Sequence, residues 1–262
     1  MHTKESLMKQ LEELNIKKDG TLLVHSSFKS LGEVEGGPDT VLDALSEYMK
    51  EGLLVLPTHT WDLVNKDNPV FDVKNSPTNV GILTELFRKR EGVIRSEHPT
   101  HSVAALGKDA EEFVAGEYKH ETPCARESVY GKLVDRNAQV LLLGVDFKRN
   151  TYIHGVEEWI DIPGRVSDSY EHLFSILHTG EKVEVPSRRH YGLAWSEHFW
   201  KVEELLMEEG SLYKGELGDA TVLVDDAAKT TELLTELLQA NPDLFSDNEP
   251  LEEEWRTFFQ NK

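Results

Sequence analysis

Short apolar runs alternate with helical patterns along the chain, and this alternation is the feature that most limits how the chain can fold. Three such runs are 21–25 (TLLVH), 53–56 (LLVL) and 139–144 (QVLLLG). Continuous apolar runs of this length are typical of strands that are covered on both faces. The span 21–56 contains a strand, a helix and a second strand, which favours parallel pairing with a right-handed crossover. We therefore expect an α/β fold.

Helical periodicity accounts for much of the remaining sequence. Apolar residues three and four apart predict helices over 4–15, 38–49, 80–89, 109–115, 129–136, 151–160, 196–209 and 226–239. Further strands are expected at 102–106 and 221–224, an antiparallel pair within 165–190, and a long surface loop over 60–79. We find no repeat and no flexible linker, so we expect residues 1–262 to form one domain with three layers.

Charge and composition exclude several classes of protein. The chain has 28 Lys and Arg against 48 Asp and Glu, a net charge of −20, which argues against nucleic acid as the partner. The absence of a long apolar stretch argues against a membrane span. The N-terminus lacks an apolar signal core, and the single cysteine, Cys124, fits a reducing compartment, so we expect a cytoplasmic protein.

The acidic excess is concentrated near the C-terminus. Residues 201–262 hold 16 acidic and 5 basic residues, which is more than half of the excess. We interpret this region as an acidic C-terminal helical segment that faces solvent. A rim that attracts cations is the less favoured interpretation.

The segment 25–37 (HSSFKSLGEVEGG) is a candidate phosphate-binding loop. It joins a predicted strand to the helix that Pro38 begins, and it contains Gly32, Gly36 and Gly37. Glycines allow close approach of a ligand to the backbone, and a helix N-terminus offers free N–H groups to an anion. Glycines between a strand and a helix are also common turn residues, so the motif alone leaves both interpretations open.

Histidines form a second constellation near the predicted strand ends. His25 and His59 follow two of the strands, and His98 and His101 precede a third. Ligands of open α/β sheets collect at the carboxyl ends of the strands. A metal site is one interpretation, but no zinc-binding spacing is present and Cys124 has no cysteine partner, so we expect no metal. His98 and His101 are equally suited to bonding the backbone of a loop.

His154 differs from the other histidines because of its neighbours. Glu157 and Glu158 lie three and four residues further along a predicted helix, so both share its face, and Asn150 lies one turn earlier. A carboxylate beside an imidazole orients the ring and stabilises its protonated form, as a general base requires. An ordinary surface His–Glu pair is the alternative.

Several segments taken together resemble the aminoglycoside 3-N-acetyltransferase family. They occur in the family's order between about residues 21 and 165: HSSFKSLGEVEGG (25–37), LLVLPTHTW (53–61), SPTNVGILTELFRKREGVIRSEHPTHSVAALG (76–107), TPCARESVYGKL (122–133) and VLLLGVDFKRNTYIHGVEE (140–158). The resemblance implies a three-layer α/β sandwich with a central mixed sheet. It also implies acetyl-CoA as the acetyl donor and the 3-amino group of a 2-deoxystreptamine ring as the acceptor.

The same resemblance implies roles for individual residues. His154 matches the family's general base, and Glu157 its carboxylate. Asp62, His98 and Glu158 are the residues expected on the acceptor side. The residues expected to contact coenzyme A are His25, Ser26, Ser27, Leu31, Gly32, Val34, Gly36 and Gly37, with Thr58 and Ser102 near the cleft.

The expected reaction is direct transfer of the acetyl group, with an anionic coenzyme and a cationic amine such as an aminoglycoside as partners. A donor such as Thr151 would stabilise the oxyanion. Acetylation of Cys124 is rejected, because this thiol has no nearby activating residue. The alternatives are an N-acetyltransferase for another amine without resistance activity, a metal-dependent amide hydrolase using His25, His59 and His98, and a coenzyme A-binding protein without catalysis.

Overall fold

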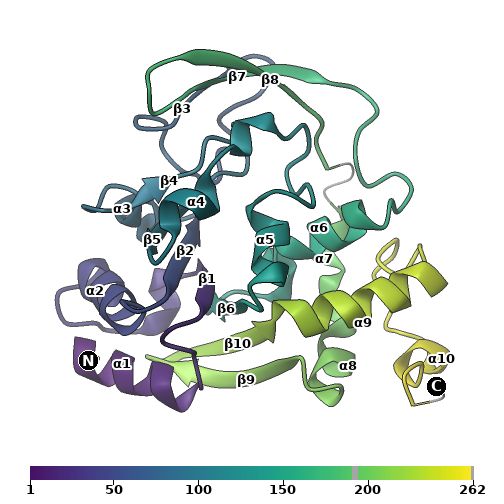
Figure 1. Ribbon diagram of the computed structural model, residues 1–262. Helices are drawn as coiled ribbons and strands as arrows, with labels where there is room; N and C mark the ends of the chain where they lie inside the picture. Colours follow the sequence, from purple (N-terminus) through teal and green to yellow (C-terminus); the bar gives the residue numbers. More distant parts are fainter. Residues whose placement is uncertain (191–193, 261–262) are drawn as a thin grey trace.

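A seven-stranded mixed sheet forms the centre of the structure, a computed structural model that describes residues 1–190 and 194–260 (Figure 1). β1, β2 and β6 run parallel, whereas β5 is antiparallel to β2 and β10 is antiparallel to β6. In spatial order the strands are β4 (Ile94–Arg95), β5 (Val103–Gly107), β2 (Leu53–Pro57), β1 (Thr21–Ser26), β6 (Gln139–Leu143), β10 (Ala220–Asp226) and β9 (Leu212–Leu217). The expected mixed sheet is therefore confirmed.

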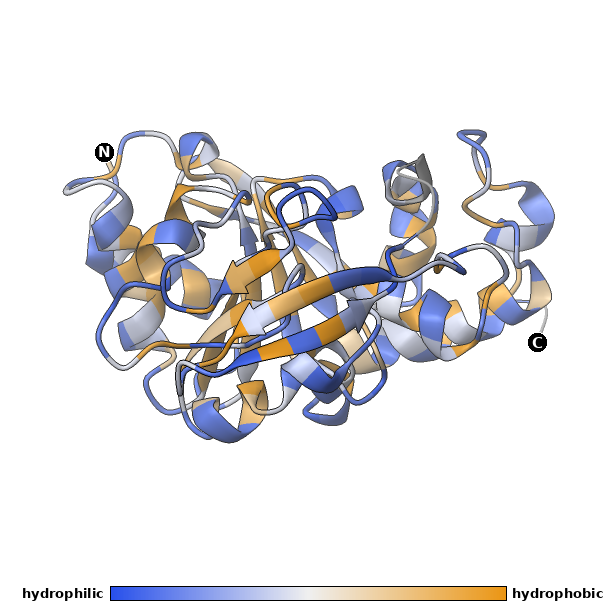
Figure 2. Cartoon of the chain, turned by 90° about the horizontal axis from the view of Figure 1, so that it is seen from above, coloured by the Kyte–Doolittle hydropathy of each residue, from blue (hydrophilic) through white to orange (hydrophobic). Residues whose placement is uncertain are grey.

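Helices cover both faces of this sheet, because successive side chains of the central strands point to opposite sides. Leu22 and Val24 belong to one buried cluster, whereas Leu23 belongs to the other. The first cluster is covered by α1 (Lys4–Glu13), α2 (Pro38–Tyr48) and α3 (Ile82–Phe87). The second is covered by α4 (Ala110–Val114), α5 (Val129–Asp135), α6 (Tyr152–Trp159), α8 (Glu203–Glu208) and α9 (Ala227–Ala240). The helices alternate between hydrophilic and hydrophobic residues, as expected for helices that bury one face (Figure 2). The three-layer α/β architecture is confirmed.

Local sequence explains how the first layer begins. Thr3 caps α1 through a reciprocal capping box with Ser6, and Pro38 occupies the first turn of α2, where its missing N–H costs nothing. β1 then pairs in parallel with β2, with Leu22 opposite Leu54. The predicted strand–helix–strand unit is therefore present, with α2 as its crossover.

A second, three-stranded sheet lies above the carboxyl end of β2, at the top of Figure 1. It consists of β3 (Val70–Asp72), β7 (Glu171–Ile176) and β8 (Lys182–Ser187), and β7 and β8 are the antiparallel pair expected within 165–190. A small cluster around Phe71 and Leu173 packs under it. Because β3 lies within 60–79, this segment is not entirely the loop that we expected.

The predicted helix over 196–209 is broken into short pieces. They are α7 (Ala194–Glu197), the 3-10 helix η4 (Phe199–Val202) and α8. Nδ1 of His198 lies 2.7 Å from the carbonyl oxygen of Phe245, and the backbone leaves helical geometry at this histidine. The remaining short elements are η1 (Phe28–Leu31), η2 (Glu117–Lys119), η3 (Phe147–Arg149) and α10 (Glu253–Arg256).

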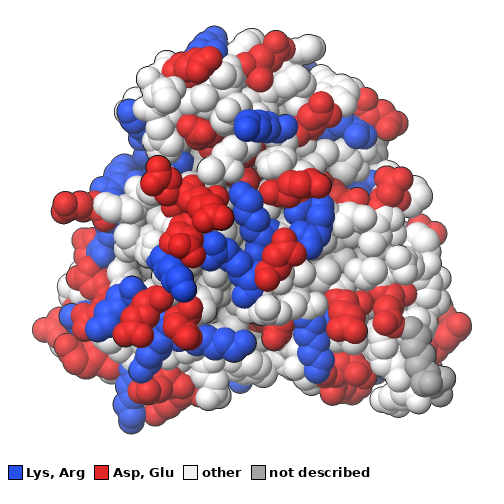
Figure 3. Space-filling model, viewed as in Figure 1, with Lys and Arg blue, Asp and Glu red and all other residues white. Residues whose placement is uncertain are grey.

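Charges of both signs are interspersed on the face shown in Figure 3, although the chain has a net charge of −20. Many acidic side chains on the surface are paired, such as Asp43 with Arg90 and Glu47 with Lys4. Within the described residues, no helix combines the length and the apolar character that crossing a membrane requires.

Candidate active site

A cavity of about 630 Å³ opens at the carboxyl ends of the three parallel strands. β1 contributes His25 and Ser26, β2 ends at Pro57 with His59 two residues later, and Val145 follows β6. This is the edge at which α/β sheets bind their ligands. The cavity therefore lies where the sequence pattern predicts a site.

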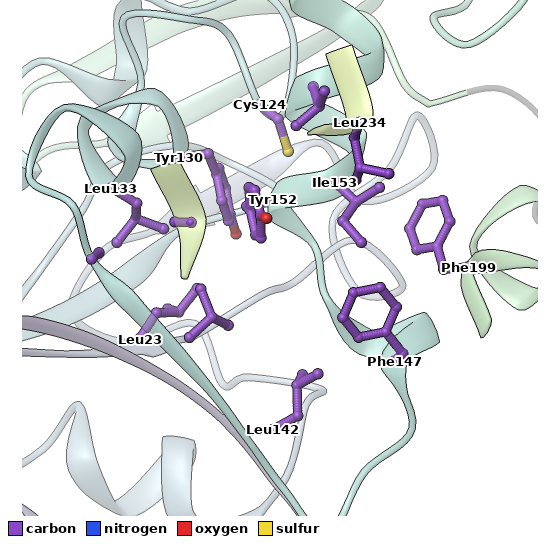
Figure 4. Close-up of a cluster of buried hydrophobic side chains, with 14 of the residues drawn as sticks. Leu23, Cys124, Tyr130, Leu133, Leu142, Phe147, Tyr152, Ile153, Phe199 and Leu234 are labelled. Carbon is purple, nitrogen blue, oxygen red and sulfur yellow. The ribbon is translucent and has the colours of Figure 1, made fainter. Parts of the chain in front are cut away.

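Helix α6 brings His154 to the cavity because its first turn is anchored on the other side. Tyr152 and Ile153 are fully buried in the hydrophobic cluster shown in Figure 4. The preceding Asn150 is also buried and donates a hydrogen bond of 2.7 Å to Asp225 on β10. Asp225 accepts another from Thr230, and burial raises its pKa to about 7. These contacts fix the start of the helix, so that His154 lines the cavity.

His154 and Glu157 form a hydrogen-bonded pair across one turn of α6. Nδ1 of the imidazole lies 3.2 Å from Oε2 of the carboxylate. An ionised carboxylate only accepts hydrogen bonds, so Nδ1 carries the hydrogen and Nε2 keeps a free lone pair. Glu157 is fully buried, and its Oε1 accepts a hydrogen bond of 2.5 Å from Nε of Arg165. This arrangement suits a proton acceptor whose orientation is fixed.

Burial and charge set the protonation of this pair. Burial lowers the pKa of His154, and the neighbouring His190 lowers it further, whereas the hydrogen bond to Glu157 opposes both effects. Burial acts to raise the pKa of Glu157, but the hydrogen bonds and electrostatic effects of His154 and Arg165 outweigh it and hold this pKa below its usual value. Glu157 is therefore ionised, and His154 is neutral at neutral pH.

Besides His154, four histidines line the cavity, and three of them, His59, His101 and His190, lie in ring contacts. The ring centroids of His59 and His101 are 4.7 Å apart, and those of His154 and His190 are 4.4 Å apart. Nε2 of His59 lies 2.6 Å from the hydroxyl of Tyr130. Burial lowers the pKa of His59 and of His101 well below 6.5, so both rings are neutral. His101 belonged to the predicted histidine constellation without an assigned role, whereas His190 was not predicted.

His25 has an unsatisfied nitrogen at the cavity. Its Nε2 is buried and has no hydrogen-bond partner within the described part of the chain. Burial lowers the pKa of this histidine to about 3, which keeps the ring neutral. Buried polar atoms are normally hydrogen-bonded, so a group that enters the cavity would complete this site.

Most other residues of the predicted coenzyme loop lie away from the cavity lining. Leu31 is buried in the core, and Ser27 accepts from the hydroxyl of Ser30 through its carbonyl oxygen. Gly32 has a φ of +74°, and the carboxylate of Asp219 lies where a Cβ atom would be placed. Val34 is buried, while Gly36 and Gly37 precede α2. Contacts of these residues with a coenzyme stay predictions.

Thr58 and Ser102 support an arginine rather than line the cavity. Their hydroxyl oxygens are 3.0 Å apart, and Nε of Arg95 donates to both at 3.1 Å. His98 accepts hydrogen bonds at Nδ1 from the backbone of Thr100 and His101, which is the loop role that its sequence context equally suited. Thr58, Ser102, His98 and the exposed Asp62 are not part of the cavity lining. The role of Asp62 stays a prediction.

Cations that the sequence analysis did not select line the cavity. Lys148 and Arg149 form part of η3, directly before α6, and Arg189 follows β8. Arg189 is fixed by the carbonyl oxygens of Trp61 and Val64. For Lys148 and Arg149, the signal in sequence was the Lys-Arg pair between the strand QVLLLG and His154. Arg189 has no comparable local signal.

Cys124 is buried next to α6. Its backbone N–H donates to Glu158 at 3.1 Å, and burial raises the pKa of its thiol well above 9. A protonated, buried thiol is a poor nucleophile, which agrees with the rejection of an acetyl-cysteine intermediate. Sulfur, oxygen and nitrogen atoms of Cys124, Glu158 and His190 lie within 4.8 Å of one another. Glu158 is already bound by His190 and the Cys124 backbone, so we assign no ion here.

The sequence is similar to those of aminoglycoside 3-N-acetyltransferases. The family model described as aminoglycoside 3-N-acetyltransferase matches residues 23–239. The SPbeta prophage-derived aminoglycoside N(3')-acetyltransferase-like protein YokD of Bacillus subtilis (strain 168) is 31% identical over 237 residues, covering 82% of this chain and 81% of that protein.

Solved structures share the fold over nearly the whole chain. A variant of aminoglycoside acetyltransferase AAC(3)-IVa in complex with a gentamicin has a TM-score of 0.81 at 29% identity, covering 93% of this chain and 90% of that one. AAC-IIIb in a binary complex with CoASH has a TM-score of 0.79 at 26% identity, covering 91% and 97%.

Proposed function

The chain belongs to the aminoglycoside 3-N-acetyltransferase family, and on this premise we propose that it transfers acetyl directly from acetyl-CoA to an amine, with His154 as general base. The first acceptor to consider is the 3-amino group of the 2-deoxystreptamine ring of an aminoglycoside. Relatives with the same fold have structures in complex with coenzyme A and with a gentamicin, which supports both classes of substrate.

The observation that carries the proposal is the His154–Glu157 pair at the cavity, in which Nδ1 is bonded to the carboxylate and Nε2 carries the lone pair. An amine is protonated at neutral pH and attacks only after it has lost a proton. His154 accepts this proton at Nε2 as the nitrogen attacks. Glu157, held by Arg165, stabilises the imidazolium that results.

The residues at the cavity fit an anionic acetyl donor. Lys148 and Arg149 supply positive charge for its phosphate groups in a chain that is otherwise strongly acidic. Ser26 adds a hydroxyl, and Nε2 of His25 adds a polar atom that has no hydrogen-bond partner among the described residues. The thioester supplies the activated acetyl group. We expect residues 27–37 to add backbone contacts behind this lining.

The transfer needs no covalent intermediate on the protein. A C–N bond forms to the thioester carbonyl carbon, the C–S bond breaks, and coenzyme A leaves as its thiolate. The proton held by His154 is then available to this leaving group. Thr151 lines the cavity beside His154, and we expect its hydroxyl to donate to the carbonyl oxygen as negative charge develops there.

One observation favours a second class of acceptor. Among the described residues, Glu197 is the single carboxylate that lines the cavity, and it is paired with Lys148 at 2.9 Å. Glu157 and Glu158 are bound by Arg165 and His190. A polycationic sugar therefore finds few free negative charges here, and an amine with fewer positive charges fits the lining better.

The test is release of free thiol from acetyl-CoA with a panel of amines that includes 2-deoxystreptamine antibiotics and singly charged amines. We expect release with at least one acceptor and a loss of about 10²–10⁴-fold in kcat for His154→Ala. His172→Ala is the matched control, because His172 also pairs with a glutamate, Glu184, but is exposed on β7. Wild-type turnover by His154→Ala would disprove the mechanism. Thermal stabilisation by coenzyme A without thiol release from any amine would indicate binding without catalysis.

A further inference from the structure

We propose that His190 and Glu158 form a second imidazole–carboxylate pair, and that this pair is a positioning device that keeps His154 in its neutral, proton-accepting form. The proposal rests on the proposed function, in which His154 is the general base. His190 is 36 positions from His154 in the sequence, and the fold brings it to the same cavity.

The geometry places the two pairs side by side. The rings of His154 and His190 stack with their centroids 4.4 Å apart and an interplanar angle of 29°. Nε2 of His190 donates to Oε1 of Glu158, and the same oxygen accepts the backbone N–H of Cys124. The Glu158 side chain is only 6% exposed. It is therefore held in place against His190 by the neighbouring loop.

Stacked imidazoles influence each other through charge. A carboxylate hydrogen-bonded to an imidazole favours the protonated form of that ring, and a charge on one of two stacked rings disfavours a proton on the other. In agreement, burial lowers the pKa of His154 most, and His190 is the next largest influence that lowers it. Glu157 and Glu158 act in the opposite direction. The balance between these groups determines whether His154 can accept a proton at neutral pH.

Other groups near His154 do not replace His190 in this role. His59 and His101 are neutral, because burial lowers their pKa values well below 6.5. Phe199 packs on His154 with ring centroids 5.0 Å apart and carries no charge.

The charged side chains that line the same cavity interact with residues other than His154. Arg189 binds the carboxylate of Glu171 and two carbonyl oxygens, and Lys148 pairs with Glu197. Arg149 lowers the pKa of His25, which burial lowers most.

The experiment is an NMR titration of the His154 imidazole in the full chain without substrate, with the signal assigned by its loss in His154→Asn. We expect the pKa of His154 to rise by about one pH unit in His190→Gln, since the glutamine keeps a hydrogen bond to Glu158 but carries no charge. His190→Phe keeps the ring contact without the charge, and we expect the same rise. If His190→Gln does not fold, His190→Phe gives the measurement.

The matched control is His172→Gln, which removes an exposed imidazole from another His–Glu pair and should leave the titration of His154 unchanged. An unchanged or lower pKa of His154 in the His190 variants would overturn the proposal. Because the titration needs no turnover, a rise in pKa without acetyl transfer to any amine would uphold the pair and refute the proposed reaction instead. In an active enzyme, the acid limb of kcat/KM should move to higher pH in both His190 variants.

Discussion

Nδ1 of His154 and Oε2 of Glu157 lie 3.2 Å apart across one turn of α6, and the carboxylate is held from its other side by Arg165. The pair thus combines a local spacing with a long-range contact. The helix sets the distance between the two side chains, and the hydrogen bond with His154 together with the buried guanidinium of Arg165 keeps the carboxylate ionised.

Replacing Glu157 by glutamine tests this relationship. The carboxylate raises the pKa of His154, so its removal should lower that pKa and move the acid limb of kcat/KM to lower pH. The loss of the stabilised imidazolium should reduce kcat by part of the about 10²–10⁴-fold that a positioned general base contributes. The measurement is a pH profile of thiol release. A limb that stays in place, or moves to higher pH, contradicts the assignment of Glu157.

Removing the cationic side chains of η3 tests the acetyl-donor site. Lys148→Ala and Arg149→Ala should each raise the KM for acetyl-CoA by about 10-fold and leave kcat nearly unchanged, because they bind charge away from the reacting atoms. The effect should weaken as salt is added. Lys9→Ala, an exposed lysine on α1, serves as control. An increase in the KM for the amine instead would place these cations on the acceptor side.

Substituting the single cysteine tests direct transfer. Cys124→Ser should retain kcat within about twofold, because the thiol is buried and protonated and takes no part in the reaction. The free energy of unfolding should fall by about 1 kcal/mol, since a buried hydroxyl replaces a mostly apolar group. Thiol release and denaturant unfolding provide the two measurements. A loss of activity without a loss of stability would favour an acetyl-cysteine route.

The buried Asp225 predicts a dependence of stability on pH. Its pKa is raised from 3.8 to about 7 in the folded protein, so the native state binds its proton more tightly than the unfolded chain. The contribution to stability is present at low pH and is lost as pH rises from about 4 to 7. Between pH 5 and pH 8, the free energy of unfolding should therefore fall by about 1–2 kcal/mol less in Asp225→Asn than in the wild type. Denaturant unfolding at the two pH values is the measurement. The exposed Asp168→Asn is the control. Identical pH dependence in Asp225→Asn and wild type would contradict the buried-proton explanation.

The strands β1, β2 and β6 were predicted from sequence because each is buried on both faces and therefore appears as a continuous apolar run. β9 lacks this signal, since only Leu212 and Leu217 at its ends are buried. β4 has two residues, too few for any periodicity. Edge strands of this kind are specified by their partners and not by their own pattern.

In the site, too, local sequence patterns predicted some contacts, whereas others depend on the fold. Glu157 was predicted as a partner of His154 because three residues along a helix place two side chains together. Arg165 comes from a turn and His190 follows a strand of the second sheet, so no local sequence spacing predicts their contact with the pair. Thr58 and Ser102 share the predicted region, but the buried Arg95 takes their hydroxyls, which a sequence motif does not reveal.

The position of β10 between β6 and β9 has a consequence for synthesis of the chain. Until Ala220–Asp226 has been made, the edge of β6 is unpaired, and this strand consists of apolar residues apart from Gln139. An exposed apolar edge of this kind is a template for pairing with another chain. Asn150 likewise lacks Asp225 until then, so α6 lacks this hydrogen-bonded anchor. A nascent or truncated chain that ends near residue 210 would therefore be prone to aggregation and would lack an ordered cavity, whatever the state of its first three strands.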